Sequence, residues 1–448
     1  MFKNFEKMEH HAQSVEDALI GGLSYKLKPG ASYVTNRRSV SYFASGGNQY
    51  SPNGVKVMKF NLTGDQWMDP STFRVMFQLN NKESGPLNFL KPLHWNPAIF
   101  FRRCRLIAGG QVIEDIDNFN RLSLMLTALK PEEEQLEIAT EGFGSFDNHH
   151  SLATGDGTNN EDLDERKEYR ENDFNESGVI ATSRRVLFKP MLGMFNQEKL
   201  IPLRYCGGLQ IELELVNNLT EPIFVGLNSG INYKSVWDIT DIQCKCDLLT
   251  LDNSLENEYA SHLLSGKTLP INFSTWNHTN QTTNSESDFS IHINRALTRL
   301  KSVFVTLHKS DSDFYKECNT FYHPMANSGY EIYDFSLENQ VWLQIGSKLI
   351  PEYPVSGVSE AYYQLKKAVG VPFHIMNRWY RTRRYIVGLD CEKISGAGFT
   401  GLNTKAGDLL TVNFRNCGAS GSQPSRMYCA LNYDAVLNIK SEGIELLD

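Results

Sequence analysis

The chain has 448 residues, which is long enough for two or three domains that each bury their own core. Aromatic residues make up 11% and charged residues 21%, with 33 glycines, and this composition excludes a disordered chain and favours a turn-rich β protein. The formal net charge is −8, and residues 154–178 alone carry nine acidic and three basic side chains. The remainder is close to neutral, so no overall field attracts nucleic acid or an anionic membrane.

Residues 1–30 are predicted to form an N-terminal arm with too little apolar surface to fold alone. The arm is too polar for a signal peptide, and no apolar run approaches the roughly 20 residues of a membrane span. The eight cysteines include no CxxC pair. We therefore expect a soluble protein, made in a reducing compartment and not secreted, with buried and reduced thiols.

Short strands are predicted from Val55 onward, because apolar side chains alternate between turn signals. In the first half these strands cover residues 55–62, 72–79, 100–107, 111–116, 199–205, 209–215 and 241–251, with a turn at Met68-Asp69-Pro70 between the first two. In the second half they cover 289–297, 299–309, 330–337, 341–346, 348–353, 385–394, 408–414 and 428–440. Each half contains one convincing helix, marked by apolar side chains at helical spacing. The first runs from Phe119 to Leu129 and stops before Pro131. The second runs from Val358 to Leu365, with Ser356 as its N-cap and Gly370 as its C-cap.

One pattern occurs twice, as a hairpin with a glycine turn followed by a short helix. Leu106, Gly109 and Ile113 align with Leu343, Gly346 and Ile350, although any two β-hairpins share some of this likeness. The repeated order of elements predicts an all-β chain of two tandem eight-stranded antiparallel jelly-roll sandwiches, with short helices in the connecting loops. The predicted domains are jelly roll 1 over 31–250, with an acidic surface loop at 144–178, and jelly roll 2 over 251–448.

Several motifs imitate catalytic or binding sites without the context that such sites need. GAGFTG at 396–401 matches a dinucleotide loop, but a strand rather than a helix is predicted after it, and SGKT at 265–268 is followed by Pro270. Asp156 to Asp162 imitates a calcium loop that lacks its glycine and its final glutamate. We predict no catalytic, cofactor or metal site, and no enzyme.

RWYRTRR, from Arg378 to Arg384, interleaves four arginines with two aromatic residues. Such a patch could neutralise and stack on nucleic acid, or it could pair with carboxylates of another subunit. The second interpretation is favoured, and Arg378, Arg381, Arg383 and Arg384 remain a candidate for a weak genome contact.

Several stretches together resemble the double-jelly-roll major capsid proteins of icosahedral double-stranded DNA viruses, in the branch of polinton-like viruses and virophages. They are FKPMLGMFNQEKLIPLRYCGGLQIELEL (188–215), SYVTNRRSVSYF, YSPNGVKVMKFNL, DPSTFRVMFQLNN, NEYASHLLSGKTLPI and GAGFTGLNTKAGDLLTVNF. The likeness is distributed over most of the chain and contains no catalytic signature.

The resemblance implies a structural protein of the virion, working as a homotrimer whose six sandwiches form a pseudo-hexameric capsomer. Its partners would be neighbouring trimers and penton and minor or cement proteins, and assembly would occur inside the host cell. The acidic loop would project outward and the arm would lie along the inner face. Two alternatives remain: a carbohydrate-binding spike or receptor-binding sandwich, and a carbohydrate-active enzyme with two carboxylates in a cleft.

Overall fold

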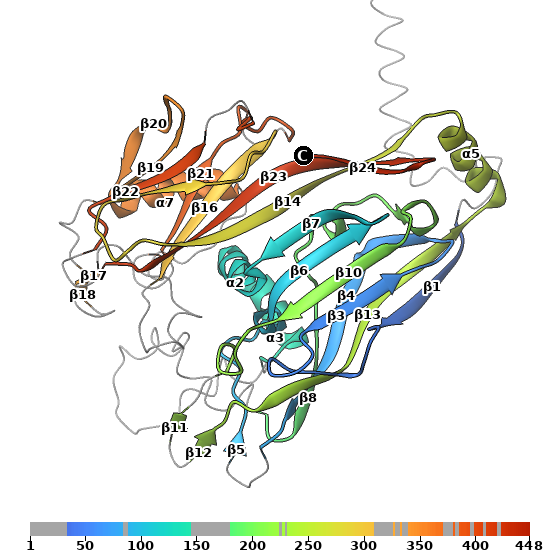
Figure 1. Cartoon of the computed structure of the whole chain (residues 1–448), viewed down its shortest axis with the longest axis horizontal. Coiled ribbons are helices and arrows are strands. Elements are labelled where there is room, and N and C mark those ends of the chain that lie inside the picture. Colours follow the sequence, from blue (N-terminus) through green and yellow to red (C-terminus); the bar gives the residue numbers. More distant parts are fainter. Residues whose placement is uncertain are drawn as a thin grey trace, which may run out of the picture.

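A computed structural model describes residues 34–83, 88–144, 180–223, 226–228, 231–308, 326–327, 332–333, 339–370, 380, 385–394, 398–405, 409–418 and 423–448. The strands form two β-sandwiches, one built from β1–β13 and the other from β14–β24 (Figure 1). The arm over 1–30 and most of the acidic loop lie outside the described residues, and the division at residue 250 stays a prediction.

The first jelly roll contains two antiparallel sheets, whose main strands follow the orders β1-β13-β4-β8 and β3-β10-β6-β7. The first sheet consists of β1 (Val34–Phe43), β13 (Trp237–Leu251), β4 (Trp67–Asn81) and β8 (Ser183–Phe188), joined at its margins by β2 (Gln49–Tyr50) and β9 (Ile201–Pro202). The second consists of β3 (Val57–Leu62), β10 (Leu209–Leu215), β6 (Phe101–Ala108) and β7 (Gln111–Asp117). A small sheet combines β5 (Asn88–Phe89), β11 (Gly226–Asn228) and β12 (Ile231–Tyr233).

The second jelly roll repeats this order strand for strand, as β14-β23-β16-β21 and β15-β22-β19-β20. The first of these sheets consists of β14 (Leu269–Thr282), β23 (Arg426–Lys440), β16 (Leu300–His308) and β21 (Ile386–Asp390), with β24 (Gly443–Leu447) beside β23. The second consists of β15 (Phe289–Ile293), β22 (Leu410–Arg415), β19 (Gln340–Ile345) and β20 (Lys348–Ser356). Strands β17 (Ala326–Asn327) and β18 (Ile332–Tyr333) pair with each other.

The hairpin and helix that the sequence repeats occupy equivalent places in the two sandwiches. Hairpin β6–β7 precedes α2 (Phe119–Leu129), and hairpin β19–β20 precedes α7 (Gly357–Val369). The first hairpin turns at Gly109 and Gly110, whose φ angles of 54° and 79° favour glycine, and the second at Gly346, with φ of 58°. The alternative that the two hairpins are alike only because any two β-hairpins share some likeness is therefore wrong. The prediction of two tandem jelly rolls is confirmed.

Some local predictions were wrong. The turn predicted at Met68-Asp69-Pro70 is instead part of β4. Residues 70–73 form a bulge opposite Cys246, so the strand continues past the proline. Within the bulge, Thr72 accepts the N–H of Asp247 at 2.9 Å. Only Ile201–Pro202 of the strand predicted at 199–205 is extended, because a 3₁₀ turn, η6 (Leu203–Tyr205), follows.

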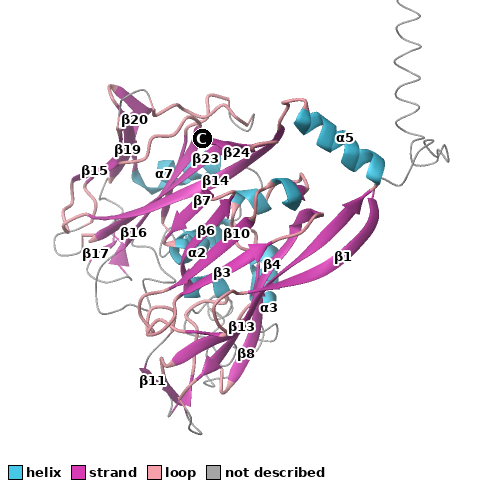
Figure 2. Cartoon of the chain, turned by 45° about the vertical axis from the view of Figure 1, so that its right-hand side comes forward, coloured by secondary structure: helices cyan, strands magenta, loops and turns pink. Residues whose placement is uncertain are grey.

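Two helices of the described chain were not predicted, namely α3 (Glu132–Glu141) and α5 (Asn253–Leu264). Several strands were also not predicted, among them β1, β8, β14 and β24. Helix α5 joins the two sandwiches, and Figure 2 shows it projecting beyond the sheets. The stretch SGKT follows α5, where Gly266 has φ of 78°, so it is a turn as predicted. Ser356 is the N-cap of α7, but its hydroxyl does not cap; Glu360 instead accepts the N–H of Ser356 at 2.7 Å.

Both sandwiches bury the alternating apolar side chains that their strands present to the interior. Strand β10 shows this clearly, because Leu209, Ile211, Leu213 and Leu215 are all buried. Seven of the eight thiols lie in the described residues; all seven are buried, as predicted, and none forms a disulfide. Burial raises the pKa of Cys246 and Cys429 to about 12, so both thiols stay protonated.

Candidate functional site at the junction of the two jelly rolls

The two sandwiches meet where β7 of the first lies beside β14 of the second (Figure 1). Glu114, on β7, is 1% exposed and accepts the N–H groups of Gly193 at 2.7 Å and Met194 at 2.8 Å. It also accepts the hydroxyl of Thr275, on β14. Burial raises the pKa of Glu114, and the three donors act against that rise. One carboxyl group thus joins three segments from both sandwiches.

The segment that donates to Glu114 is η5 (Gly193–Phe195), which packs too closely against the second sandwich to carry a side chain at Gly193. A Cβ atom there would lie 2.0 Å from the carbonyl oxygen of Ser274. On the other side, Phe195 stacks on Phe73 with ring centroids 4.3 Å apart, which anchors η5 in the first core. The junction is therefore fixed both by hydrogen bonds and by backbone contact.

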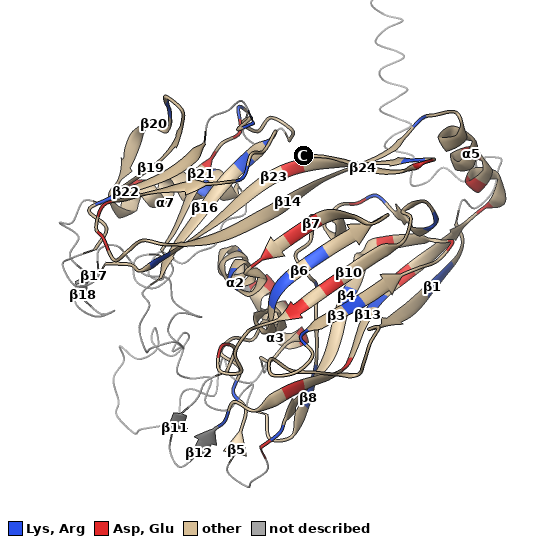
Figure 3. Cartoon of the chain, viewed as in Figure 1, with Lys and Arg blue, Asp and Glu red and all other residues tan. Residues whose placement is uncertain are grey.

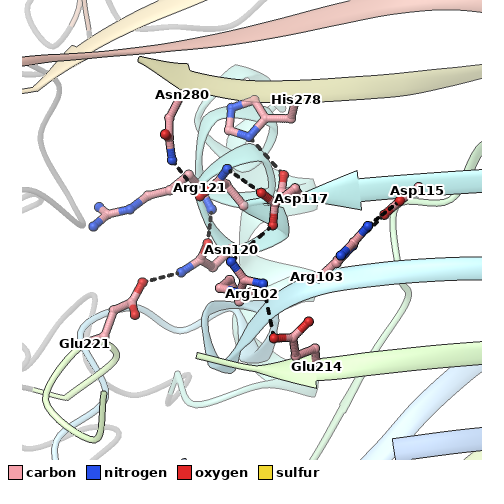
Figure 4. A network of polar contacts seen from close by, with 11 residues as sticks. Arg102, Arg103, Asp115, Asp117, Asn120, Arg121, Glu214, Glu221, His278 and Asn280 are labelled. Carbon is pink, nitrogen blue, oxygen red and sulfur yellow. Dashed lines mark hydrogen bonds and ion pairs between the residues drawn. The ribbon is translucent and has the colours of Figure 1, made fainter. Parts of the chain in front are cut away.

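A second set of polar contacts crosses the junction at the start of α2 (Figure 4). A ring nitrogen of His278, on β14, lies 3.2 Å from the carbonyl oxygen of Asp117. Asn280 donates to the side chain of Asn118 at 3.0 Å. Asn118 is the N-cap of α2, with a left-handed φ of 49°, and its side chain makes no cap hydrogen bond. The amide oxygen of Asn118 instead accepts the hydrogen bond from Asn280 across the junction.

Aromatic and cationic groups continue this contact into the second sandwich. The ring of His278 is stacked on Tyr428 with centroids 5.7 Å apart, and His308 meets the same tyrosine edge-on at 4.8 Å. Arg121, from α2, lies 5.8 Å from the centre of the Tyr428 ring. Burial lowers the pKa of His278 to about 4 and that of His308 well below its usual range, and the charge of Arg121 adds to both shifts. Both imidazoles are therefore neutral at pH 7.

Ion pairs on the first sandwich hold β6, β7 and β10 in register behind this contact. Arg103 makes two hydrogen bonds to Asp115, at 2.7 and 2.5 Å, and Arg102 donates to Glu214 at 3.1 Å (Figure 4). Asn120, in the first turn of α2, donates to Glu221 at 3.0 Å. These pairs position Asp117 and Asn118 for their partners on β14.

The carboxyl groups of this junction are occupied by partners within the chain. These groups face backbone donors, hydroxyls and arginines rather than an open cleft, and the described part of the chain contains no group of three or more side chains that could hold a metal.

No described helix is long and apolar enough to cross a membrane. Where GAGFTG is described, at 398–401, residues 402–405 beyond it are not helical, and the strand predicted after it is β22.

Other candidates from the sequence cannot be placed. Arg378, Arg381, Arg383 and Arg384 and the calcium-like stretch at 156–167 lie outside the described residues. The junction residues were not predicted, because their partners are some 160 positions away in the chain. One signal was available: Glu114 shares a strand face with Ile116 in QVIEDI, and a lone carboxylate on an apolar face needs buried donors.

Comparisons with known proteins identify the architecture. No family model matches the sequence, and no curated protein matches it in sequence. Among solved structures, VP54 of PBCV-1, fitted into a reconstruction of the virophage Sputnik, covers 95% of this chain and 100% of its own, with 12% identity and a TM-score of 0.61. The chain has the double-jelly-roll fold of viral capsid proteins.

Two further structures support the same assignment of the fold. The Faustovirus major capsid protein matches over 94% of both chains, with 8% identity and a TM-score of 0.58. A chain of the Sputnik virophage structure matches over 95% of this chain and 90% of its own, with 12% identity and a TM-score of 0.56. The coverage is nearly complete in each case, so the likeness includes both sandwiches.

Proposed function

We propose that this chain is a major capsid protein, a structural component of an icosahedral viral shell with no enzymatic activity. The observation that carries the proposal is the identical strand order of its two sandwiches, which full-length capsid proteins match from end to end. Residues buried at the junction face backbone and neighbouring side chains, which suits a structural component better than a catalyst.

The duplication has a geometric use. Three copies of a chain with two equivalent sandwiches form a ring with six similar lobes, and such a ring can sit among six neighbours in a shell. The polar and aromatic contacts of the junction would hold each pair of lobes at one angle, which the lattice requires. We therefore infer a homotrimer that acts as a pseudo-hexameric capsomer.

The surface also offers an element suited to contacts between subunits. Helix α5 projects from the sheets, and Leu264 at its end is 81% exposed (Figure 2). A contact that covered this leucine would remove its apolar surface from water, which favours association. We infer that α5 contacts a neighbouring copy, whether within the trimer or between trimers.

The remaining partners follow from a shell role. They would be neighbouring trimers, penton proteins and minor or cement proteins, in a virion assembled inside the host cell. The acidic loop would face outward and the arm inward, and Arg378, Arg381, Arg383 and Arg384 would provide at most a weak genome contact. Limited proteolysis of intact particles tests the two faces: cleavage in the acidic loop alone is expected, and cleavage at the arm alone would reverse them.

The first experiment is light scattering on the purified chain. A species near three times 50.8 kDa, about 152 kDa, is expected, with a hexagonal outline in electron micrographs. A stable monomer that forms no lattice and binds glycans would instead favour the spike or receptor-binding alternative. Substitution of the four arginines adds a second test, since normal trimers with reduced DNA retention would assign that patch to the genome.

A further inference from the structure

The outer face of the β15-β22-β19 sheet contains an open depression of about 460 Å³ at one end of the second sandwich. Its floor is formed by side chains that point away from the core on three neighbouring strands, and its rim by the loop between β14 and β15. The residues that line it are Thr282, Thr283, Asn284, Glu286, Asp288, Phe289, Ser290, Ile291, Trp342, Gln344, Asn413, Phe414 and Arg415. This volume lies within the range of roughly 300–1,000 Å³ typical of small-molecule sites.

The rim is tied to the floor by hydrogen bonds. Asp288 accepts the N–H of Asn416 at 2.8 Å, just beyond the end of β22. Cys417 donates its N–H to the carbonyl oxygen of Ser287 at 2.9 Å. Two residues at the tip of the loop, Asn284 and Ser285, have positive φ angles of 54° and 56°, as a tight turn requires. The depression is thus built by defined backbone geometry.

The first sandwich fills the equivalent place with ion pairs. There Glu212 on β10 is flanked across the strands by Lys59 and Arg105, and its two oxygens each lie 2.7 Å from one of those cations. Figure 3 shows basic and acidic residues on these strands, β6 and β10 among them. Both oxygens of the carboxylate in this row are therefore occupied by cations of the same row.

In the second sandwich the same row consists of Ser290, Asn413 and Trp342. Asn413 is 5% exposed and accepts the hydroxyl of Ser290 at 2.6 Å, but its amide nitrogen has no hydrogen-bond partner among the described residues. A buried amide donor without a partner is destabilising. Asn413 lines the depression, so a ligand hydroxyl that reaches this nitrogen through a small shift of its neighbours would satisfy the donor.

Trp342 adds an aromatic surface to the row. The guanidinium of Arg415 lies 5.1 Å from its ring centroid, which fixes the indole and places a strong donor beside it. Glu286 and Asp288 supply acceptors on the rim. The depression therefore combines one indole with both donors and acceptors, and its two carboxylates outnumber its single cation.

We propose that this depression binds a neutral saccharide. A sugar ring presents an apolar C–H face to an aromatic side chain, and its hydroxyls both donate and accept, which matches Trp342 and the groups around it. The excess of carboxylates disfavours phosphorylated or sulfated ligands. The proposal is independent of the capsid role, because it rests on the second sandwich alone.

The test uses the full-length protein and immobilised conjugates of glucose, galactose, mannose and N-acetylglucosamine, with sialyllactose as an anionic comparison. Wild-type protein is expected to bind at least one neutral conjugate. Trp342→Ala should weaken that binding at least about tenfold and Arg415→Ala about fivefold, because anchoring side chains carry most of the binding energy. Tyr353→Ala is the matched control: Tyr353, on β20 of the same sheet, is 57% exposed and does not line the depression.

Each result decides the proposal. Loss of binding in Trp342→Ala and Arg415→Ala, with wild-type solution mass and thermal midpoint, supports it, while Tyr353→Ala should change affinity less than about twofold. Arg415 is exposed, so its variant reports on binding even if Trp342→Ala folds poorly. No binding of any neutral conjugate at concentrations up to about 10 mM overturns the proposal. Preference for sialyllactose overturns it too, as does an altered oligomeric mass of the variants without saccharide binding, which would assign the face to subunit contacts.

Discussion

The carboxylate of Glu114 in the first jelly roll accepts a hydrogen bond from the hydroxyl of Thr275 in the second, although 161 positions separate the two residues. The same carboxylate accepts two backbone N–H groups of η5. A single buried side chain thus links β7, η5 and β14. Because each partner would otherwise be buried without a hydrogen bond, the free energy of unfolding should depend strongly on this group.

Glu114→Gln should lower the free energy of unfolding by about 1–3 kcal/mol at pH 7, because the new amide group points its own hydrogens at backbone donors. Chemical denaturation monitored by tryptophan fluorescence measures the change. The control is Glu134→Gln, which removes an exposed ion pair between Glu134, on α3, and Lys130, at the end of α2, and should change stability by less than about 0.5 kcal/mol. Equal effects of the two substitutions would show that Glu114 does not hold the junction.

Gly193→Ala should destabilise the protein by about 1–3 kcal/mol, because the added Cβ would lie 2.0 Å from the carbonyl oxygen of Ser274 and the sandwiches would have to separate locally. Gly54→Ala is the control, since the Cβ there would meet only the carbonyl oxygen of Ser51, at 4.0 Å. Thermal unfolding of both variants checks the prediction. A wild-type midpoint for Gly193→Ala would contradict the close packing of η5 against β14.

The fold could be predicted largely because its signals are local. The alternation in LQIELEL marks β10 residue for residue, and the Gly109-Gly110 turn marks the first hairpin. Strand β14 was not found because its residues, such as those in STWNHTNQT, are mostly polar on both faces. They are polar because Thr275 and His278, which lie on opposite faces of this unbroken strand, both hydrogen-bond to residues of β7 across the junction.

The candidate site could not be predicted from the sequence, because its contacts join residues that are far apart in the chain. Nothing near His278 in the chain indicates that Asp117, Arg121 and Tyr428 surround it. Likewise, the row Ser290–Asn413–Trp342 joins three strands that are distant in sequence, and only the register of the sheet brings it together. Patterns along one strand predict which face is buried, but they do not predict which partner covers it.

Acid should weaken the junction through His278. Its pKa in the folded chain is about 4, against 6.5 when it is exposed, so the unfolded chain binds the extra proton first. The stability that neutral His278 contributes is therefore fully present above pH 6.5 and is lost as the pH falls toward 4. His308, whose pKa is also lowered, acts in the same direction, whereas the raised pKa of Glu114 acts in the opposite one.

His278→Phe isolates this contribution, because it keeps an aromatic ring against Tyr428 and removes the titrating group. The free energy of unfolding of wild-type protein should fall more steeply between pH 6.5 and 4.5 than that of the variant, by up to about 1.4 kcal/mol per pH unit. The same pair compared between pH 7.5 and 8.5 provides the control, since both curves should be parallel there. Parallel curves over the whole range would mean that His278 titrates normally in the folded protein.

Assembly should depend on the exposed end of α5. Leu264→Asp places a charge where an apolar side chain is 81% exposed, so folding should be unaffected, while any contact that buries this side chain would have to desolvate a carboxylate. Asn257→Asp adds the same charge to an exposed position of the same helix without removing apolar surface, and it is the matched control. Light scattering over a concentration series should show the Leu264→Asp variant dissociating at concentrations at least about tenfold higher than wild type, and Asn257→Asp behaving as wild type. If both variants keep the wild-type mass distribution and still form a lattice, α5 faces solvent in the assembled shell, and the contacts between copies must come from the sheet edges and loops instead.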